Sequence, residues 1–177
     1  MSDVPHSAEY LAGVPNPEKF RTKVHVYWHE CDAARIAYYG NFLKWVEQAE
    51  EDLFVSRGQT RGAVYQRLQI GFPRVEVWIR YRKPARLSDT LTVDWWVEKR
   101  TRTSLVARTE LRRVGETELV AEASSRLVCI NKEFQPTAIP DEMVKLLHGY
   151  LPPVTSHTHD EVQPHHDAPK HKETHRW

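Results

Sequence analysis

The stretch that most constrains the fold is residues 24–57, because its hydrophobic pattern changes there from the period of a strand to that of a helix. Residues 23–28 alternate between apolar and polar side chains. This pattern is typical of a half-buried strand, here with Val24, Val26 and Trp28 on one face. A short polar loop that carries Asp32 follows. The chain is therefore predicted to run from a strand through a loop directly into a helix.

The predicted helix opens near Gly40 and Asn41 and is amphipathic. Its apolar residues recur at steps of three and four, which places them on one face: Phe42, Trp45, Val46, Ala49, Leu53 and Phe54. Asn41 is interpreted as the N-cap, since its side-chain oxygen can accept a hydrogen bond from an amide of the first turn. Asp32 is then held in the loop before a helix N-terminus, where amide groups and the helix dipole favour negative charge.

Four further strands are predicted downstream. The first two alternate between apolar and polar side chains, and a glycine turn at residues 114–116 joins the last two; the strands span Arg74–Tyr81, Leu91–Lys99, Ser104–Arg113 and Leu119–Asn131. A short closing helix is expected within residues 140–151. Five mostly antiparallel strands and one long helix make an α+β domain. The sheet face away from the helix is expected to expose Trp78, Trp96 and Val106, which favours an interface with another subunit.

Composition excludes several classes of protein. The 177 residues contain 25 Lys and Arg against 24 Asp and Glu, so no charge excess favours nucleic acid. No apolar run reaches the roughly 20 residues of a membrane-spanning helix. Without a signal-peptide pattern, and with only two cysteines, we expect a cytoplasmic protein. No cofactor is predicted.

The domain is predicted to span residues 20–151. Residues 1–19 form an extended leader in this interpretation, and Tyr10 and Leu11 pack onto the domain. Residues 152–177 are rich in histidine and proline and are predicted to be a disordered tail. The tail histidines do not have the spacing of a preformed metal site, although they could bind metal adventitiously: His157, His159, His165 and His166.

The residues from Asp32 to Phe42, followed by Trp45, Glu47 and Ala49, resemble the signature of the 4-hydroxybenzoyl-CoA thioesterase type of hotdog-fold enzymes. The resemblance extends through residues 80–85, 127–131 and 139–140 and covers roughly residues 20–150. It implies a hotdog fold, in which a five-stranded sheet wraps around one central helix. It also implies hydrolysis of an acyl-CoA thioester.

By this resemblance Asp32 matches the catalytic carboxylate, acting as nucleophile or as general base. Tyr39 matches the position whose backbone amide polarises the thioester carbonyl, with the Gly40 amide beside it. Amide donors of this kind contribute about 3 to 4 kcal/mol in acyl-transfer sites. Tyr38 and Asn41 are predicted to contact substrate.

Arg35 stands where the family usually has glycine. Glycine is favoured where the backbone φ is positive or where a ligand approaches closely. Arg35 therefore either tolerates an uncommon conformation or shows that glycine was not needed; its guanidinium either meets a substrate phosphate or carboxylate or is simply solvated. For the phosphates of CoA the best-placed cations are those at the end of the predicted strand 74–81, especially Arg82 and Lys83, with Arg80 and Arg86 beside them.

Other groups are weighed against Asp32. Glu47 either acts in catalysis from the helix, as in some hotdog thioesterases, or hydrogen-bonds a neighbouring strand or subunit. His29 either carries protons or lies beside the pocket, and Cys31 is interpreted as a small apolar residue. Glu50 and Glu51 are expected to be solvated.

The predicted partners are an acyl-CoA substrate and further copies of the chain, as a homodimer or a homotetramer. Acyl chain identity and delivery by CoA or by a carrier protein stay open at this stage. The alternative function is a non-catalytic hotdog protein that binds an acyl thioester or a protein partner.

Overall fold

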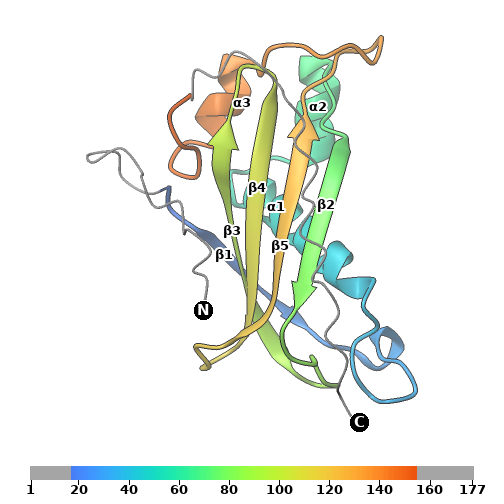
Figure 1. Cartoon of the computed structure of the whole chain (residues 1–177). Helices are drawn as coiled ribbons and strands as arrows, with labels where there is room; N and C mark the ends of the chain where they lie inside the picture. The colour runs from blue at the N-terminus through green and yellow to red at the C-terminus, as the bar shows by residue number, and fades with distance from the viewer. Residues whose placement is uncertain (1–16, 155–177) are drawn as a thin grey trace, which may run out of the picture.

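The computed structural model describes residues 17–154, and a five-stranded antiparallel sheet forms its body in the order β1-β3-β4-β5-β2 (Figure 1). Three helices complete it. The elements are β1 (Phe20–His25), α1 (Asn41–Ser56), α2 (Arg61–Leu68), β2 (Arg74–Tyr81), β3 (Thr90–Arg100), β4 (Ser104–Arg113), β5 (Leu119–Val128) and α3 (Asp141–Leu146). This is the predicted α+β hotdog arrangement.

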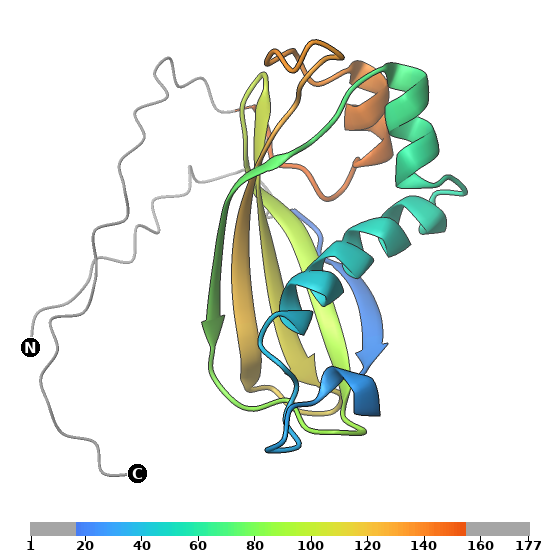
Figure 2. The ribbon, with the colours of Figure 1, turned by 90° about the vertical axis from the view of Figure 1, so that its right-hand side faces the viewer.

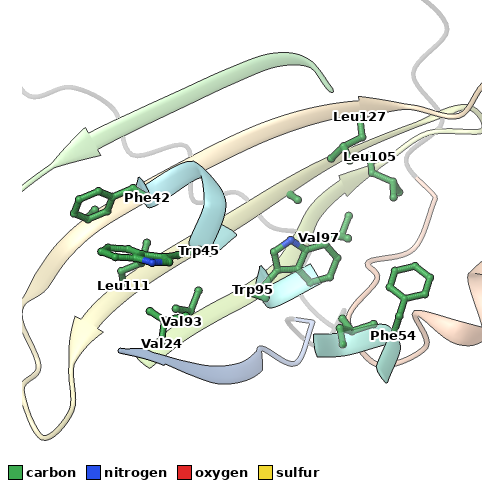
Figure 3. Packing of buried hydrophobic residues seen from close by; sticks show 14 of the residues in the cluster. Val24, Phe42, Trp45, Phe54, Val93, Trp95, Val97, Leu105, Leu111 and Leu127 are labelled. Atoms are coloured by element: carbon green, nitrogen blue, oxygen red, sulfur yellow. The ribbon is translucent and has the colours of Figure 1, made fainter. Parts of the chain in front are cut away.

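Helix α1 lies across one face of the sheet, with α2 and α3 at one end of the same face (Figure 2). Its buried side chains include all six of the predicted apolar stripe, from Phe42 to Phe54. They meet the inward-facing residues of the middle strands, such as Val93, Trp95 and Leu111 (Figure 3). The period of three and four residues therefore identified the face that forms the core.

The first strand differs from its prediction. β1 covers Phe20–His25 rather than residues 23–28, and Trp28–Glu30 form a short 3₁₀ turn. Val24 and Val26 are buried as expected, but Trp28 is 73% exposed. The turn ends the alternation, so Trp28 no longer shares a face with the two valines.

The helix start also differs. Gly40 is the N-cap, and Asn41 is the first helical residue rather than the cap. The Asn41 side chain instead donates from Nδ2 to the Glu30 carbonyl oxygen, at 2.8 Å. It thus ties the helix to the loop before it.

The sheet face away from α1 carries the predicted Trp78, Trp96 and Val106, but charged side chains lie among them. Asp94 is buried there, and its carboxylate accepts two hydrogen bonds from Arg21, at 2.6 and 2.8 Å. Arg112 pairs with Glu110 at 3.0 Å and contacts Asp94 at 3.4 Å. The Lys19 ammonium, which also pairs with Glu110, lies over the partly buried Trp96 ring. Ion pairs between strands therefore cover this face.

The edge strand β2 exposes several large apolar side chains. The large side chains exposed along it are Val75, Val77, Trp78 and Tyr81. Within residues 17–154, β2 pairs only with β5, so its other edge offers backbone groups that no described strand pairs with. This edge is the part of the described surface best suited to pair with another strand.

The proposed domain limits of 20–151 stay a prediction. The leader lies outside the described residues up to residue 16, and the tail lies outside them from residue 155, including its four histidines. Among the residues that are described, no helix is long and apolar enough to cross a membrane.

Candidate active site

Asp32 occupies a tight loop between β1 and α1. The loop closes through an antiparallel bridge between Cys31 and Ala37 and through the Asp32 amide, which donates to the Ile36 carbonyl at 2.9 Å. Asp32 Oδ1 accepts from the Ala34 amide at 2.8 Å and from the Ile36 amide at 3.4 Å. Oδ2 has no hydrogen-bond partner among residues 17–154, and the side chain is exposed. One carboxylate oxygen is thus fixed, and the other is available for chemistry.

Arg35 adopts a left-handed backbone conformation. Its φ is +61°. A non-glycine residue held there costs on the order of 1 kcal/mol. The loop is nonetheless retained, because the Arg35 amide donates to the Asp32 carbonyl and the Arg35 carbonyl accepts from the Leu87 amide. Of the two sequence alternatives, Arg35 tolerates the uncommon conformation.

The N-terminus of α1 presents two free amide groups. In the described part of the chain, the Tyr39 and Gly40 amides donate to no other group, whereas the Tyr38 amide donates to Glu30 and the Asn41 amide to Tyr38. The helix dipole adds a partial positive charge at this end. Two such donors suit a developing oxyanion.

The surroundings of Gly40, rather than its backbone conformation, disfavour a larger residue here. Its φ is −65°, which any residue can adopt. A Cβ at this position would lie 2.9 Å from Cε1 of the Tyr38 ring. The Tyr38 and Tyr39 rings are 4.4 Å apart, and the Tyr81 hydroxyl donates to the Tyr39 carbonyl at 3.1 Å. The end of β2 therefore borders the candidate site.

Some of the cations predicted to bind the phosphates of CoA are already in ion pairs, and others are not. Arg82 is paired with Glu122 and Lys83 with Glu118. Arg35 and Arg86 are exposed and form no ion pair with any described residue, and Ile36 and Arg86 form an isolated antiparallel bridge. Arg86 also lines a surface hollow of about 450 Å³, together with Lys83, Pro84, Asp89, Arg113 and Glu116.

The competing groups lie elsewhere or are engaged. Glu47 pairs with Arg61 at 2.8 Å and stays largely exposed. His29 is exposed and stacks on Tyr27. Burial, together with the charges of Asp32 and Glu30, raises the pKa of Cys31, so this thiol is a poor nucleophile.

Glu50 is not solvated as predicted, because it is buried and paired with Arg61 and Arg74, at 3.1 and 2.6 Å. It lines a small internal cavity of about 20 Å³ with apolar neighbours, including Leu53, Phe54 and Trp95. By helical rise this cavity lies about 15 Å along α1 from Gly40. It has room for roughly one water molecule and none for an acyl group.

Sequence reasoning missed Glu30. This carboxylate is 3% exposed and receives hydrogen bonds from Lys44 Nζ and Trp45 Nε1 of α1. The available signal was its spacing from Tyr27, since an acid three residues after a turn start often accepts from that residue's amide. The Tyr27 amide does so at 2.9 Å. Among residues 17–154, no cluster of three or more potential ligands could hold a metal ion.

The chain is similar to known proteins over most of its described length. The family model described as the thioesterase-like superfamily matches residues 26–147, which is most of the chain. The chain belongs to the thioesterase-like superfamily. The predicted family, hotdog fold and enzyme class are thereby confirmed.

Several superfamily members are similar over most of their length. The acyl-CoA thioester hydrolase YbgC of Escherichia coli O157:H7 is 26% identical over 130 residues, covering 73% of this chain and 96% of the relative. The 4-hydroxybenzoyl-CoA thioesterase of Pseudomonas sp. (strain CBS-3) is 26% identical over 125 residues, covering 66% and 89%. The solved 1,4-dihydroxy-2-naphthoyl-CoA thioesterase from Synechocystis shares the fold, with a TM-score of 0.67, 22% identity and coverage of 73% and 95%.

Proposed function

We propose that this protein is an acyl-CoA thioesterase that hydrolyses a small or medium acyl or aroyl thioester to the free acid and CoA. The observation that carries the proposal is that one carboxylate oxygen and two backbone amide groups of the candidate site are available to a substrate. One oxygen of Asp32 is unengaged, and the Tyr39 and Gly40 amides at the start of α1 are unengaged within the described structure. The superfamily relatives named above support the substrate class.

In the proposed mechanism the thioester carbonyl oxygen accepts from the Tyr39 and Gly40 amides. Asp32 then either attacks the carbonyl carbon or removes a proton from an attacking water. Direct attack forms a mixed anhydride and expels the CoA thiolate, and water then cleaves the anhydride. A single turnover in ¹⁸O-labelled water tests for the anhydride. Label in the Asp32 side chain supports an anhydride that water cleaves at the Asp32 carboxyl carbon, whereas label in the product acid alone arises from the general-base route and also from an anhydride cleaved at the acyl carbon.

For substrate binding, the proposed roles follow the available contacts. Tyr38 lines the acyl entrance, while Asn41 acts by tying α1 to the preceding loop. Arg82 and Lys83 are already neutralised by glutamates, so their contribution to CoA binding is expected to be small. Arg35 and Arg86 are the cations proposed to meet the phosphates of CoA. A guanidinium group binds phosphate well because it can donate two parallel hydrogen bonds to it.

The proposed assembly is a homodimer, or a homotetramer built from it, in which β2 pairs with its copy. The exposed apolar side chains of β2 and its open edge support this arrangement. Val77→Lys should weaken the dimer in a light-scattering measurement, whereas Val114→Lys, an equally exposed valine in a turn, should not. A cytoplasmic location stays a prediction.

The test of function is thiol release from short, long and aromatic acyl-CoAs by the purified protein. Asp32→Asn should lower kcat at least about 100-fold on the best substrate. Glu47→Gln, the matched carboxylate on the exposed side of α1, should change kcat less than about threefold. No turnover with any thioester, or an active Asp32→Asn variant, would overturn the proposal and favour a binding protein.

A further inference from the structure

Glu30 is a buried charge at the candidate site that the mechanism does not use. It ends the 3₁₀ turn two residues before Asp32 and is 3% exposed. Its carboxylate accepts from the Tyr27 amide at 2.9 Å, from Lys44 Nζ at 3.0 Å and from Trp45 Nε1 at 3.2 Å. Two of these donors belong to the early part of α1. The side chain therefore connects the loop to the helix.

The backbone of Glu30 makes the same connection a second time. Its carbonyl oxygen accepts from the Tyr38 amide and from Asn41 Nδ2, both at 2.8 Å. These two partners flank Tyr39 and Gly40, whose amides are the proposed oxyanion donors. One residue thus fixes the chain on both sides of the donors and lies next but one to the catalytic carboxylate.

The negative charge of the Glu30 side chain is needed for the three hydrogen bonds that its carboxylate accepts. Burial alone would raise the pKa of the carboxyl, but the Tyr27, Lys44 and Trp45 donors outweigh it and the pKa lies below its ordinary value. Three donors converge on two acceptor oxygens. A glutamine offers one acceptor oxygen and an amide group that donates, so it cannot satisfy all three.

We propose that Glu30 is a positioning residue for thioester hydrolysis, which holds the Asp32 loop and the Tyr39 and Gly40 amides in register through its carboxylate and its carbonyl. This inference rests on the proposed function. Misplacement of reacting groups by about 1 Å can cost on the order of 100-fold in rate, so a residue of this kind acts on kcat.

The test compares Glu30→Gln with Glu50→Gln. Glu50 is a close match, because it is also buried and also accepts from an indole, Trp95 Nε1, and from cations. It lies farther along α1, away from the proposed donors. We expect Glu30→Gln to lower kcat about 10- to 100-fold with KM within about threefold. Glu50→Gln should leave both constants within about threefold, at a temperature where both variants are folded.

A second measurement does not need turnover. The ¹H and ¹⁵N resonances of the Tyr39 and Gly40 amides should shift in Glu30→Gln and stay unchanged in Glu50→Gln. Equal kcat values for Glu30→Gln and wild type, or equal effects of the two variants on the amide resonances, would overturn the inference. The proposed function fails separately, by an active Asp32→Asn variant or by the absence of turnover in wild type, and the amide resonances still decide the role of Glu30.

Discussion

The start and the second half of α1 contain the same kind of hydrogen bond in different surroundings. Each buries one glutamate that accepts from a tryptophan indole: Glu30 from Trp45 near the start, and Glu50 from Trp95 in the second half. At the start the surroundings are open, and Tyr39 is 62% exposed. In the second half the glutamate lies beneath arginines and beside an apolar cavity.

The two carboxyl groups respond to burial in opposite directions. Hydrogen bonds from Tyr27, Lys44 and Trp45 overcome burial and lower the pKa of Glu30. Burial dominates at Glu50 and raises its pKa despite Arg74 and Arg61. The start of α1 therefore stabilises the charged form of Glu30 close to the Tyr39 and Gly40 amides, whereas its second half contributes mainly to the stability of the fold.

The largest expected contrast is between two leucines of α1. Leu53 is fully buried in the second half, and Leu43 is 45% exposed near the start. Leu53→Ala should reduce the free energy of unfolding by about 2 to 5 kcal/mol, because it leaves a cavity. Leu43→Ala should cost about 0.5 kcal/mol or less. Urea unfolding of both variants measures this, and similar losses would contradict the division of roles.

The next contrast concerns Gly40. In Gly40→Ala the new methyl group meets the Tyr38 ring, which must shift beside the proposed oxyanion donors. We expect kcat/KM to fall about tenfold, equivalent to about 1.4 kcal/mol, with little change in the melting temperature. Adding Tyr38→Ala to this variant should recover part of the loss relative to Tyr38→Ala alone. A Gly40→Ala variant as active as wild type would contradict the steric argument.

The pH dependence of stability should separate the two glutamates. Because the pKa of Glu30 is lowered from 4.5, its charge stabilises the fold above that pH and the contribution is lost as pH falls below it. Because the pKa of Glu50 is raised from 4.5, its contribution is complete below that pH and is lost as pH rises above it.

Each pKa unit of difference between folded and unfolded states corresponds to about 1.4 kcal/mol. On acidification below pH 4.5, the free energy of unfolding of Glu30→Gln should therefore fall less steeply than that of wild type. As the pH rises above 4.5, the free energy of unfolding of Glu50→Gln should fall less steeply than that of wild type. Parallel pH curves for both variants and wild type would show that neither carboxyl is perturbed as argued.

The smallest contrast uses two left-handed residues. Arg35 and Gln69 have φ of +61° and +56°, at the site loop and at the end of α2. Replacing either by glycine relieves the strain, offset by glycine's larger unfolded entropy, so stability should rise by about 1 kcal/mol or less. Only Arg35→Gly should raise the KM for acyl-CoA, by about threefold or more. An equal KM would remove Arg35 from the proposed phosphate contacts.

Much of the fold was predictable because the signals are local. Alternation gave the limits of β2, and those of β3 within one residue at each end, while the glycine turn at residues 114–116 helped to place β4. The helical stripe of α1 was equally clear. The Asp32 loop was identified through its resemblance to a family motif, and the left-handed Arg35 explains why glycine is usual there.

The remaining errors come from contacts between distant residues. Asn41 was misread as a cap because the Glu30 carbonyl, eleven residues earlier, recruits its side chain. Glu50 was read as solvated because its partners Arg61 and Arg74 follow later in the chain. Trp28 was assigned to the strand face because the apolar alternation continues through it, although the chain turns into a 3₁₀ helix at that residue.

The strand order has a consequence for how the chain folds. β3, β4 and β5 are joined by short connections and pair with their sequence neighbours, whereas β1 reaches forward to β3, pairing Phe20 with Trp95. Contacts between residues far apart in sequence form late, because the intervening chain must first give up its freedom. The Asp32 loop leads directly out of β1. We therefore expect the middle hairpins to form first during refolding, and hydrolytic activity to return last.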